Sequence, residues 1–376
     1  MATYRRKVIS TASTCSFAVV FLGYSFSYLT RFSTFIPISI SSGFSFFVAL
    51  ASVVMIFLSA VYFRKLYLHE AAFLIWVAFA LSYASFAIAL GAPNHSLLTQ
   101  GIGFAQAVSL WLIFRNLDLQ NRAVKRVSEL SLVVCGLAVL SVPNNISVEN
   151  AHLISYHTTA MILFLSGFVA ATRPRVYSSA IAVGITLFFL YENGARTEFF
   201  LFAAIGPTLI LKRLGGASIV IGGVVFLFVI VLVAANIDQL LQIEDASRIL
   251  GLFELSHDQS FIERSIILND ALRTIGDHPF WGDYASYRQG YYSHNALSAW
   301  VDFGMFGFSI YLLTVLAISK SAYKTYSNNK KENLPLFLLV GSFVLSIVLS
   351  KDYHHPMIGV VAGLVSASMA SRNWKS

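Results

Sequence analysis

The chain of 376 residues is 57% hydrophobic and only 12% charged, and its mean hydropathy is +0.70. Soluble domains carry about a quarter charged residues, so this composition excludes a water-soluble fold. The charged residues gather between apolar runs of about 20 residues, the length of helix that crosses about 30 Å of hydrocarbon. A transmembrane barrel would instead show alternating segments of about ten residues. The sequence therefore predicts an all-α polytopic membrane protein.

Twelve apolar runs are candidates for transmembrane helices. They lie near residues 9–29, 36–62, 69–90, 96–114, 128–143, 152–171, 176–192, 197–211, 216–236, 294–318, 334–350 and 356–371. The fifth and the eighth are short. We expect about twelve transmembrane helices, nine within residues 1–236 and three within residues 294–376, separated by one large external loop of residues 237–293.

The connections between the predicted spans alternate sharply in charge, and most of the basic residues fall on one side of the predicted membrane. The positive-inside rule makes the basic side cytoplasmic, so we expect both termini in the cytoplasm and the 237–293 loop outside. The net charge of +8 follows from this topology and calls for no nucleic acid partner. The cytoplasmic side takes 19 of the 26 basic residues: Arg5, Arg6, Lys7, Arg64, Lys65, Arg115, Arg122, Lys125, Arg126, Arg173, Arg175, Lys212, Arg213, Lys320, Lys324, Lys330, Lys331, Arg372 and Lys375.

The 237–293 segment is too polar to span a membrane and too long to be an ordinary connection. Ile262, Ile266, Ile267, Ala271 and Ile275 recur in it at helical spacing, which predicts an amphipathic helix. The segment carries nine acidic residues and only four arginines, so it does not attract anions by its overall charge. Any contact with an anion must come from particular arginines.

Arg264 and Arg288 are the candidates for such a contact in the loop. The guanidinium group grips a phosphate through two parallel hydrogen bonds, which lysine does not reproduce. The alternative for both residues is a surface salt bridge.

A third arginine, Arg196, opens a predicted span on the external side, beside Glu192 and Glu198. Ionisable residues at this depth are costly unless they are paired or functional. Arg196 is therefore either a further phosphate ligand or the partner of one glutamate in an ion pair that fixes the external end of the helix.

His294 and Asn295 stand at the external start of another predicted span, ahead of Gly304 and Gly307. A histidine has an ordinary pKa near 6.5 and can act as a general base at neutral pH. The alternative is a histidine at a helix end that only hydrogen-bonds a neighbour.

We expect neither a metal nor a cofactor. His354 and His355 are adjacent in a short external turn, and the acidic residues show no Asp-x-Asp array of the kind that holds a divalent cation. A donor that carries its own diphosphate leaving group would then be held by arginines in place of magnesium.

Three strings follow one another in the second half of the chain. They are Ala-Arg-Thr at 195–197, Arg264 ahead of His-Pro-Phe-Trp-Gly at 278–282, and His294-Asn295 ahead of Gly-Met-Phe-Gly at 304–307. In this order and on this topology they resemble the superfamily of O-antigen ligases and O-antigen polymerases, which are bacterial envelope glycosyltransferases. The resemblance covers about residues 191–313. The chain departs from it at 282–284, which read Gly-Asp-Tyr where the family often has Gly-x-Gly.

The resemblance implies a membrane glycosyltransferase with its active site on the periplasmic face of the bacterial inner membrane. Arg196 and Arg264 would hold the diphosphate of an undecaprenyl-diphosphate-linked glycan, and His294 would engage the attacking hydroxyl, with Asn295 in support. Arg288 matches no family motif and stays a candidate from its chemistry alone. The partners implied are lipid-linked oligosaccharides as donor and acceptor, with a chain-length regulator protein as a candidate partner.

Polymerase and ligase use the same donor and differ in the acceptor, which is a lipid-linked repeat unit for the polymerase and lipid A-core for the ligase. The 32 phenylalanines and the SNNKKEN segment are typical of an AT-rich polysaccharide gene cluster, which favours the polymerase. An alternative of another class is a secondary transporter or lipid-glycan flippase. Such transporters show internal repeats and charged residues near the bilayer midplane, which this sequence lacks.

Overall fold

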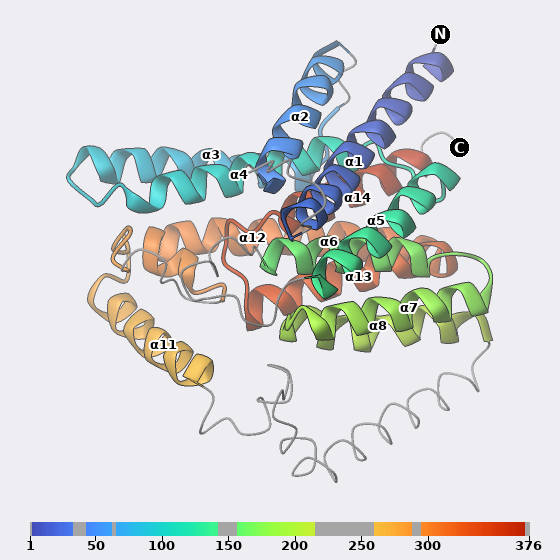
Figure 1. The fold of residues 1–376 in the computed structure, drawn as a ribbon. Coiled ribbons are helices and arrows are strands. Elements are labelled where there is room, and N and C mark those ends of the chain that lie inside the picture. Colours follow the sequence, from blue (N-terminus) through green and yellow to red (C-terminus); the bar gives the residue numbers. More distant parts are fainter. Residues whose placement is uncertain are drawn as a thin grey trace. The chain divides into compact units, whose positions relative to one another are not determined.

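The computed structural model describes residues 2–32, 43–61, 65–141, 156–214, 259–287 and 295–372. These residues form helices and no strand, so the all-α prediction is confirmed for the part of the chain described (Figure 1). The helices are α1 (Ala2–Phe32), α2 (Gly43–Val61), α3 (Leu68–Ala89), α4 (His95–Phe114), α5 (Arg122–Leu140), α6 (Tyr156–Ala171), α7 (Val176–Glu192), α8 (Arg196–Leu214), α11 (Gln259–Asp277), α12 (Ser298–Asn328), α13 (Lys330–Leu349) and α14 (Met357–Arg372).

Eleven of these helices overlap predicted spans, and α11 is the helix predicted in the loop. The remaining predicted span, 216–236, lies outside the described residues. Some helices begin at other residues than predicted, because a capping side chain sets where the helix starts. α5 begins at Arg122 rather than near residue 128, because the side chain of Asn121 accepts a hydrogen bond from the N–H of Ala123 at 2.9 Å.

Five of the described helices contain stretches long and apolar enough to cross a membrane. They are Lys7–Thr30, Leu68–Ala89, Ser96–Phe114, Ser298–Asn328 and Glu332–Leu349. Four further apolar helices are shorter. At 1.5 Å per residue a helix of 16 residues reaches only about 24 Å, less than the full hydrocarbon thickness. The long apolar helices indicate a membrane-embedded protein.

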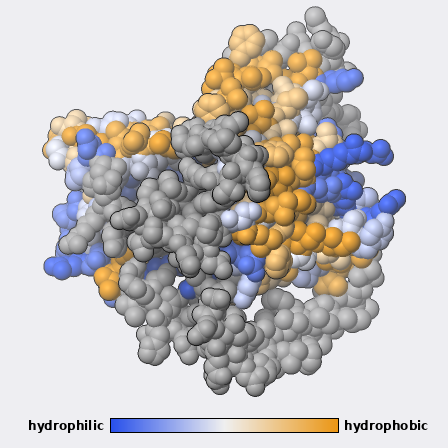
Figure 2. All heavy atoms as spheres, in the orientation of Figure 1, coloured by the Kyte–Doolittle hydropathy of each residue, from blue (hydrophilic) through white to orange (hydrophobic). Residues whose placement is uncertain are grey.

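Large apolar side chains lie on the outside of several helices. On α2, Phe46, Leu50, Val53, Ile56 and Phe57 are about half exposed or more, and hydrophobic surface covers this helix in Figure 2. A soluble protein rarely shows such a contiguous apolar surface. These side chains are placed as lipid-facing residues would be.

The described helices pack into two compact units. The first comprises Met1–Phe17, Ser45–Asp118 and Glu263–Ser376, and the second Ala18–Phe44 and Leu119–Ile262. In the first unit α14 packs along α4, and α12 packs against both α3 and α13. Helices that the predicted loop separates in sequence therefore share one core.

In the second unit α5, α6, α7 and α8 pack against one another in chain order. Two glycines allow close approach: a Cβ atom on Gly136 would lie 2.0 Å from the ring of Phe189, and one on Gly167 would lie 2.1 Å from the hydroxyl of Thr186. Small residues at helix contacts are the usual means of close packing in membranes, where burial of apolar surface gives little driving force.

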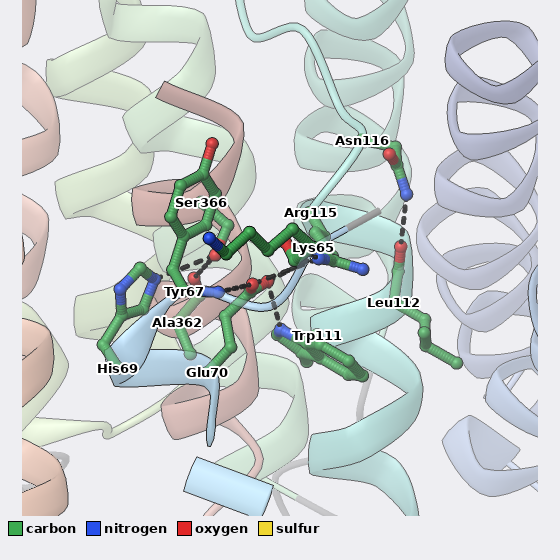
Figure 3. Close-up of polar contacts among 10 residues, drawn as sticks. All are labelled: Lys65, Tyr67, His69, Glu70, Trp111, Leu112, Arg115, Asn116, Ala362 and Ser366. Carbon is green, nitrogen blue, oxygen red and sulfur yellow. Dashed lines mark hydrogen bonds and ion pairs between the residues drawn. The ribbon is translucent and has the colours of Figure 1, made fainter. Parts of the chain in front are cut away.

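A buried ion pair joins α3 to α4 in the first unit (Figure 3). Glu70, in the first turn of α3, is fully buried, and Arg115 follows the last turn of α4. Their charged groups approach to 2.6 Å. The carboxylate of Glu70 also accepts hydrogen bonds from Trp111 Nε1 at 3.1 Å and from the backbone N–H of Tyr67 at 2.9 Å. Nearby, His69 Nε2 lies 2.8 Å from the hydroxyl of Ser366 on α14.

The replacement Arg115→Ala should destabilise the protein strongly, because it leaves the carboxylate of Glu70 buried without its counter-charge. Loss of one partner of a buried ion pair typically costs about 3–5 kcal/mol. The measurement is thermal unfolding of the purified protein in detergent. The matched control is Arg173→Ala, which breaks the ion pair between Arg173 and Glu129. The side chains of both residues in this pair are 36% exposed. The control should cost less than about 1 kcal/mol. Equal effects of the two replacements would contradict the importance given to the buried pair.

Candidate functional site

The helix α12 is interrupted at Gly304, whose backbone angles (φ 64°, ψ −170°) are not helical. In an unbroken helix the N–H of Met305 would donate to the carbonyl of Val301. Here the N–H of Met305 donates to Pro279 O at 2.9 Å, and Val301 O accepts from the N–H of Asp283 at 2.7 Å. The turn of residues 279–283 therefore supplies partners for both backbone groups that the break sets free, which an apolar environment demands.

Two glycines make this contact between backbones possible. A Cβ atom on Gly304 would lie 2.1 Å from Phe280 O, and one on Gly282 would lie 2.5 Å from both Gly304 N and Val301 O. Both glycines also have positive φ, 71° at Gly282 and 64° at Gly304. Only glycine fits either position. The His-Pro-Phe-Trp-Gly string and the Gly-Met-Phe-Gly string are separated by 21 residues in sequence and thus form a single unit, which we call the turn–break contact.

Side chains reinforce the turn–break contact from two helices. Trp300 Nε1 of α12 donates to Pro279 O at 2.9 Å, and the hydroxyl of Tyr83 on α3 donates to Trp281 O. The ring of Trp281, 69% exposed, lies 5.6 Å from the ring of Phe306. The turn is therefore held to α3 as well as to α12.

Asp302, just before the break, is the centre of a buried polar network. Its Oδ2 atom accepts from the hydroxyl of Tyr353 at 2.6 Å and from Gln100 Nε2 at 3.3 Å, and its Oδ1 atom accepts from the N–H of Ala285 at 3.2 Å. Tyr284 donates its hydroxyl to Gln100 Oε1 at 2.8 Å. Asp302 therefore connects α12 with α4, with the turn between α13 and α14, and with Ala285, which follows the turn of residues 279–283.

Burial raises the pKa of the Tyr284 and Tyr353 hydroxyls above the ordinary value near 10, and the charge of Asp302 raises both further. Both groups therefore stay protonated at neutral pH. Each serves as a hydrogen-bond donor, Tyr353 to the carboxylate of Asp302 and Tyr284 to Gln100.

Arg264 lies on α11 and belongs to the first unit. It is half-buried and shares one face of the helix with Ile267 and Ala271, both buried. The amphipathic helix is confirmed, but the placing of Ile266 on this face was wrong, because its side chain is 55% exposed. Ile266 and Ile267 are adjacent and lie about 100° apart around the helix axis, and in the structure Ile267 is the one that packs inward.

Arg196 is the first residue of α8 and belongs to the second unit. Gly194, with φ 69°, makes the tight turn from α7, and Ala195 is buried between them. Glu198 is nearly buried in the same first turn, where a negative charge stabilises the positive end of the helix dipole, whereas Glu192 is exposed. Arg196 is half-buried at this helix start.

His294 and Arg288 lie outside the described residues, so their roles stay predictions. Asn295 is described: its Oδ1 atom accepts from the N–H of Leu297 at 2.9 Å. The next residue, Ala296, donates its N–H to Ile347 O of α13 at 2.7 Å. The residue that directly follows His294 is thus fixed at the start of α12.

Sequence reasoning missed Asp302, Gln100 and Tyr353. The signal was present, because Asp302 and Gln100 are polar residues inside predicted spans, where an uncompensated polar group is costly and usually has a purpose. Nothing local showed that they meet, since 202 residues separate Gln100 from Asp302.

No three His, Cys, Asp or Glu residues gather closely enough to hold a metal ion within the residues that the structure describes. Neither a protein-family model nor a curated protein matches this chain.

The replacement Gly304→Ala should break the turn–break contact, because the new Cβ would overlap Phe280 O and alanine disfavours φ 64°. We expect a loss of about 3 kcal/mol or more. The matched control is Gly341→Ala in α13, where a Cβ meets nothing within 4 Å and should be neutral or stabilising by up to about 1 kcal/mol. Thermal unfolding and trypsin cleavage within residues 259–287 measure both effects. A Gly304→Ala protein as stable and as resistant as the control would refute the contact.

Proposed function

We propose that the protein is an O-antigen polymerase of the bacterial inner membrane. It has about twelve transmembrane helices with both termini in the cytoplasm. It transfers an undecaprenyl-diphosphate-linked glycan onto the terminal sugar of a lipid-linked repeat unit at the periplasmic face. Undecaprenyl diphosphate is the leaving group, and the reaction takes no metal, cofactor or nucleotide.

The observation that carries this proposal is the turn–break contact. Two of the three strings on which the resemblance rests are joined there by the hydrogen bond from the N–H of Met305 to Pro279 O and by two glycines that admit no side chain. The N–H of Asp283 donates a hydrogen bond to Val301 O at 2.7 Å. These two residues flank the segment that contains Arg288 and His294. Strings that meet in this way support the view that they act together.

The chemistry requires an activated hydroxyl on one side of an anomeric carbon and a departing diphosphate on the other. In the proposed reaction the acceptor oxygen bonds to the anomeric carbon while the bond from that carbon to the diphosphate oxygen breaks. Arg196 and Arg264 stabilise the charge that develops on the diphosphate, as fixed cationic donors do best where water is excluded. His294 engages the attacking hydroxyl, with Asn295 in support. The energy comes from the lipid-diphosphate linkage of the donor.

The positions of the buried charges favour an enzyme over a transporter or flippase. Glu70 and Arg115 lie at the ends of α3 and α4, and Asp302 lies in the second turn of α12. Transport sites characteristically lie near the bilayer midplane, at breaks in the middle of helices. Among the described residues the buried charged side chains lie at or close to helix ends instead.

The test is an incubation of purified, reconstituted protein with synthetic undecaprenyl-diphosphate repeat units alone, without lipid A-core, metal or nucleotide. The wild type should produce a ladder of lengthening glycans. We expect the rate to fall by about 100-fold or more in each of Arg196→Ala, Arg264→Ala and His294→Ala. The two arginine replacements remove contacts to the negative charge that develops on the diphosphate in the transition state. The histidine replacement removes the contact to the attacking hydroxyl.

The matched control for Arg264→Ala is Arg273→Ala, on the same helix with a side chain 84% exposed. This control should retain the wild-type rate. A ladder that appears only after addition of lipid A-core would replace the polymerase by the ligase. A ladder that survives all three replacements would overturn the assignment of the site, and translocation without any glycan product would favour a flippase.

A further inference from the structure

The turn of residues 279–283 is held at the beginning of a candidate membrane span. The N–H of Met305 donates to Pro279 O, and Val301 O accepts from the N–H of Asp283. Val301 and Met305 belong to Ser298–Asn328, a helix long and apolar enough to cross a membrane. At 1.5 Å per residue, Met305 lies about 10 Å from the start of this helix. The turn therefore lies at the level where the apolar part of α12 begins.

Two large side chains of this turn are exposed. Phe280 is 55% exposed and Trp281 is 69% exposed. The ring of Trp281 lies 5.6 Å from that of Phe306, which is itself 51% exposed on α12. Tryptophan is enriched at the boundary between hydrocarbon and water, since its ring is apolar and its N–H is polar. The turn therefore continues the exposed apolar surface of α12.

Helix α3 extends the same surface. The hydroxyl of Tyr83 donates to Trp281 O. Phe86, one helical turn further along α3, is 63% exposed. Leu68–Ala89 is also long and apolar enough to cross a membrane. Exposed apolar side chains of two candidate spans therefore adjoin the turn, which favours lipid over a soluble partner as its neighbour.

Helix α11 ends at Asp277, just before the turn, and its sides differ in chemistry. Ile267 and Ala271 are buried. Leu268 and Leu272 each follow one of them by one residue, so they lie about 100° further around the helix axis. Leu268 is 37% exposed and Leu272 is 52% exposed. The helix therefore carries an exposed apolar strip beside its buried strip.

A polar strip lies about 100° further around α11. Asn269 and Arg273 are exposed there, and Nε of Arg273 lies 3.9 Å from Oδ2 of Asp277, which is also exposed. Ile266 is an exposed apolar residue on this polar side. The helix runs obliquely to α12 rather than along it (Figure 1). A helix with separate strips for protein, lipid and water has the pattern of one that lies in a membrane interface.

We infer that α11 and the turn of residues 279–283 lie in the bilayer interface at this end of α12, with Leu268, Leu272 and Trp281 in contact with phospholipid acyl chains. An interfacial helix sinks its apolar side by about 5–10 Å. Burial of apolar area holds it there, because the exposed Arg273 pairs with Asp277 on the same helix. An uncharged phospholipid therefore suffices as the partner. The inference goes beyond the proposed function and does not depend on it.

The first test attaches a nitroxide spin label at Leu268→Cys or at Leu272→Cys. The background carries Cys15→Ser and Cys135→Ser, which remove both native cysteines, and the protein is reconstituted in phosphatidylcholine vesicles. Molecular oxygen dissolves in hydrocarbon, whereas a charged or chelated nickel reagent stays in water. Both labels should therefore collide mainly with oxygen, as measured by power saturation of their electron paramagnetic resonance.

The matched controls are labels at Asn269→Cys and Arg273→Cys, each the next residue on the same helix. These labels should collide mainly with the nickel reagent, so the ratio of oxygen to nickel collisions should be several-fold lower than at the two leucines. All four side chains are exposed, so the buried strip stays intact and the thermal unfolding of the labelled proteins should agree. Equal ratios at the leucines and the controls would overturn the inference. Labels at the leucines that neither reagent reaches would mean that protein covers the strip, which would overturn it too.

The second test measures tryptophan fluorescence in vesicles of phosphatidylcholine brominated on the acyl chain. Bromine quenches only at short range, so Trp281 should be quenched, whereas Trp76, which is fully buried, should not. Trp281→Phe keeps a ring beside Phe306 and should lose a measurable part of the quenching. The same quenched fraction in Trp281→Phe and the wild type would overturn the placing of the turn. Neither test uses a glycan substrate, so failure of the proposed function would leave both results unchanged.

Discussion

The backbone hydrogen bonds at the break in α12 are the constraint on which the candidate site depends. A helix in an apolar environment cannot leave an N–H or a carbonyl unpaired without a cost of several kcal/mol per group. At Gly304 the helix breaks, and the turn at 279–283 pairs both groups, through Pro279 O and the N–H of Asp283. Neither segment can take this conformation alone, so the end of α11 and the start of α12 are fixed together.

The two ends of the first unit handle buried charge in different ways. At one end Glu70 and Arg115 neutralise each other, and the contacts from Trp111 and Tyr67 complete a closed cluster (Figure 3). At the other end Asp302 has no cationic partner at hydrogen-bond distance among the described residues and is held by neutral donors. A carboxylate that is held only by neutral hydrogen-bond donors still exerts an electric field on a nearby reacting group. In a matched ion pair the fields of the two charges largely cancel. This contrast supports the Asp302 end as the place of the proposed reaction.

The proposed reaction needs cations for a diphosphate and a base for a hydroxyl. Of the candidate cations, Arg264 is carried by α11 in the first unit and Arg196 by the first turn of α8 in the second. A reacting group must be held by neighbours whose own positions are fixed. In the first unit the turn–break contact and the Asp302 network would supply such rigid support at the start of α12.

The sequence by itself determined the all-α class, the position of eleven of the predicted spans as helices and the amphipathic helix at residues 259–277, because hydropathy and helical period are local properties. It also marked Gly282 and Gly304 as parts of motifs. Only the tertiary structure decided that these glycines touch, that Ile267 rather than Ile266 packs inward, and that Asp302 meets Gln100 and Tyr353. Those contacts join residues far apart in the chain, and their pairing depends on how the helices pack rather than on any local pattern.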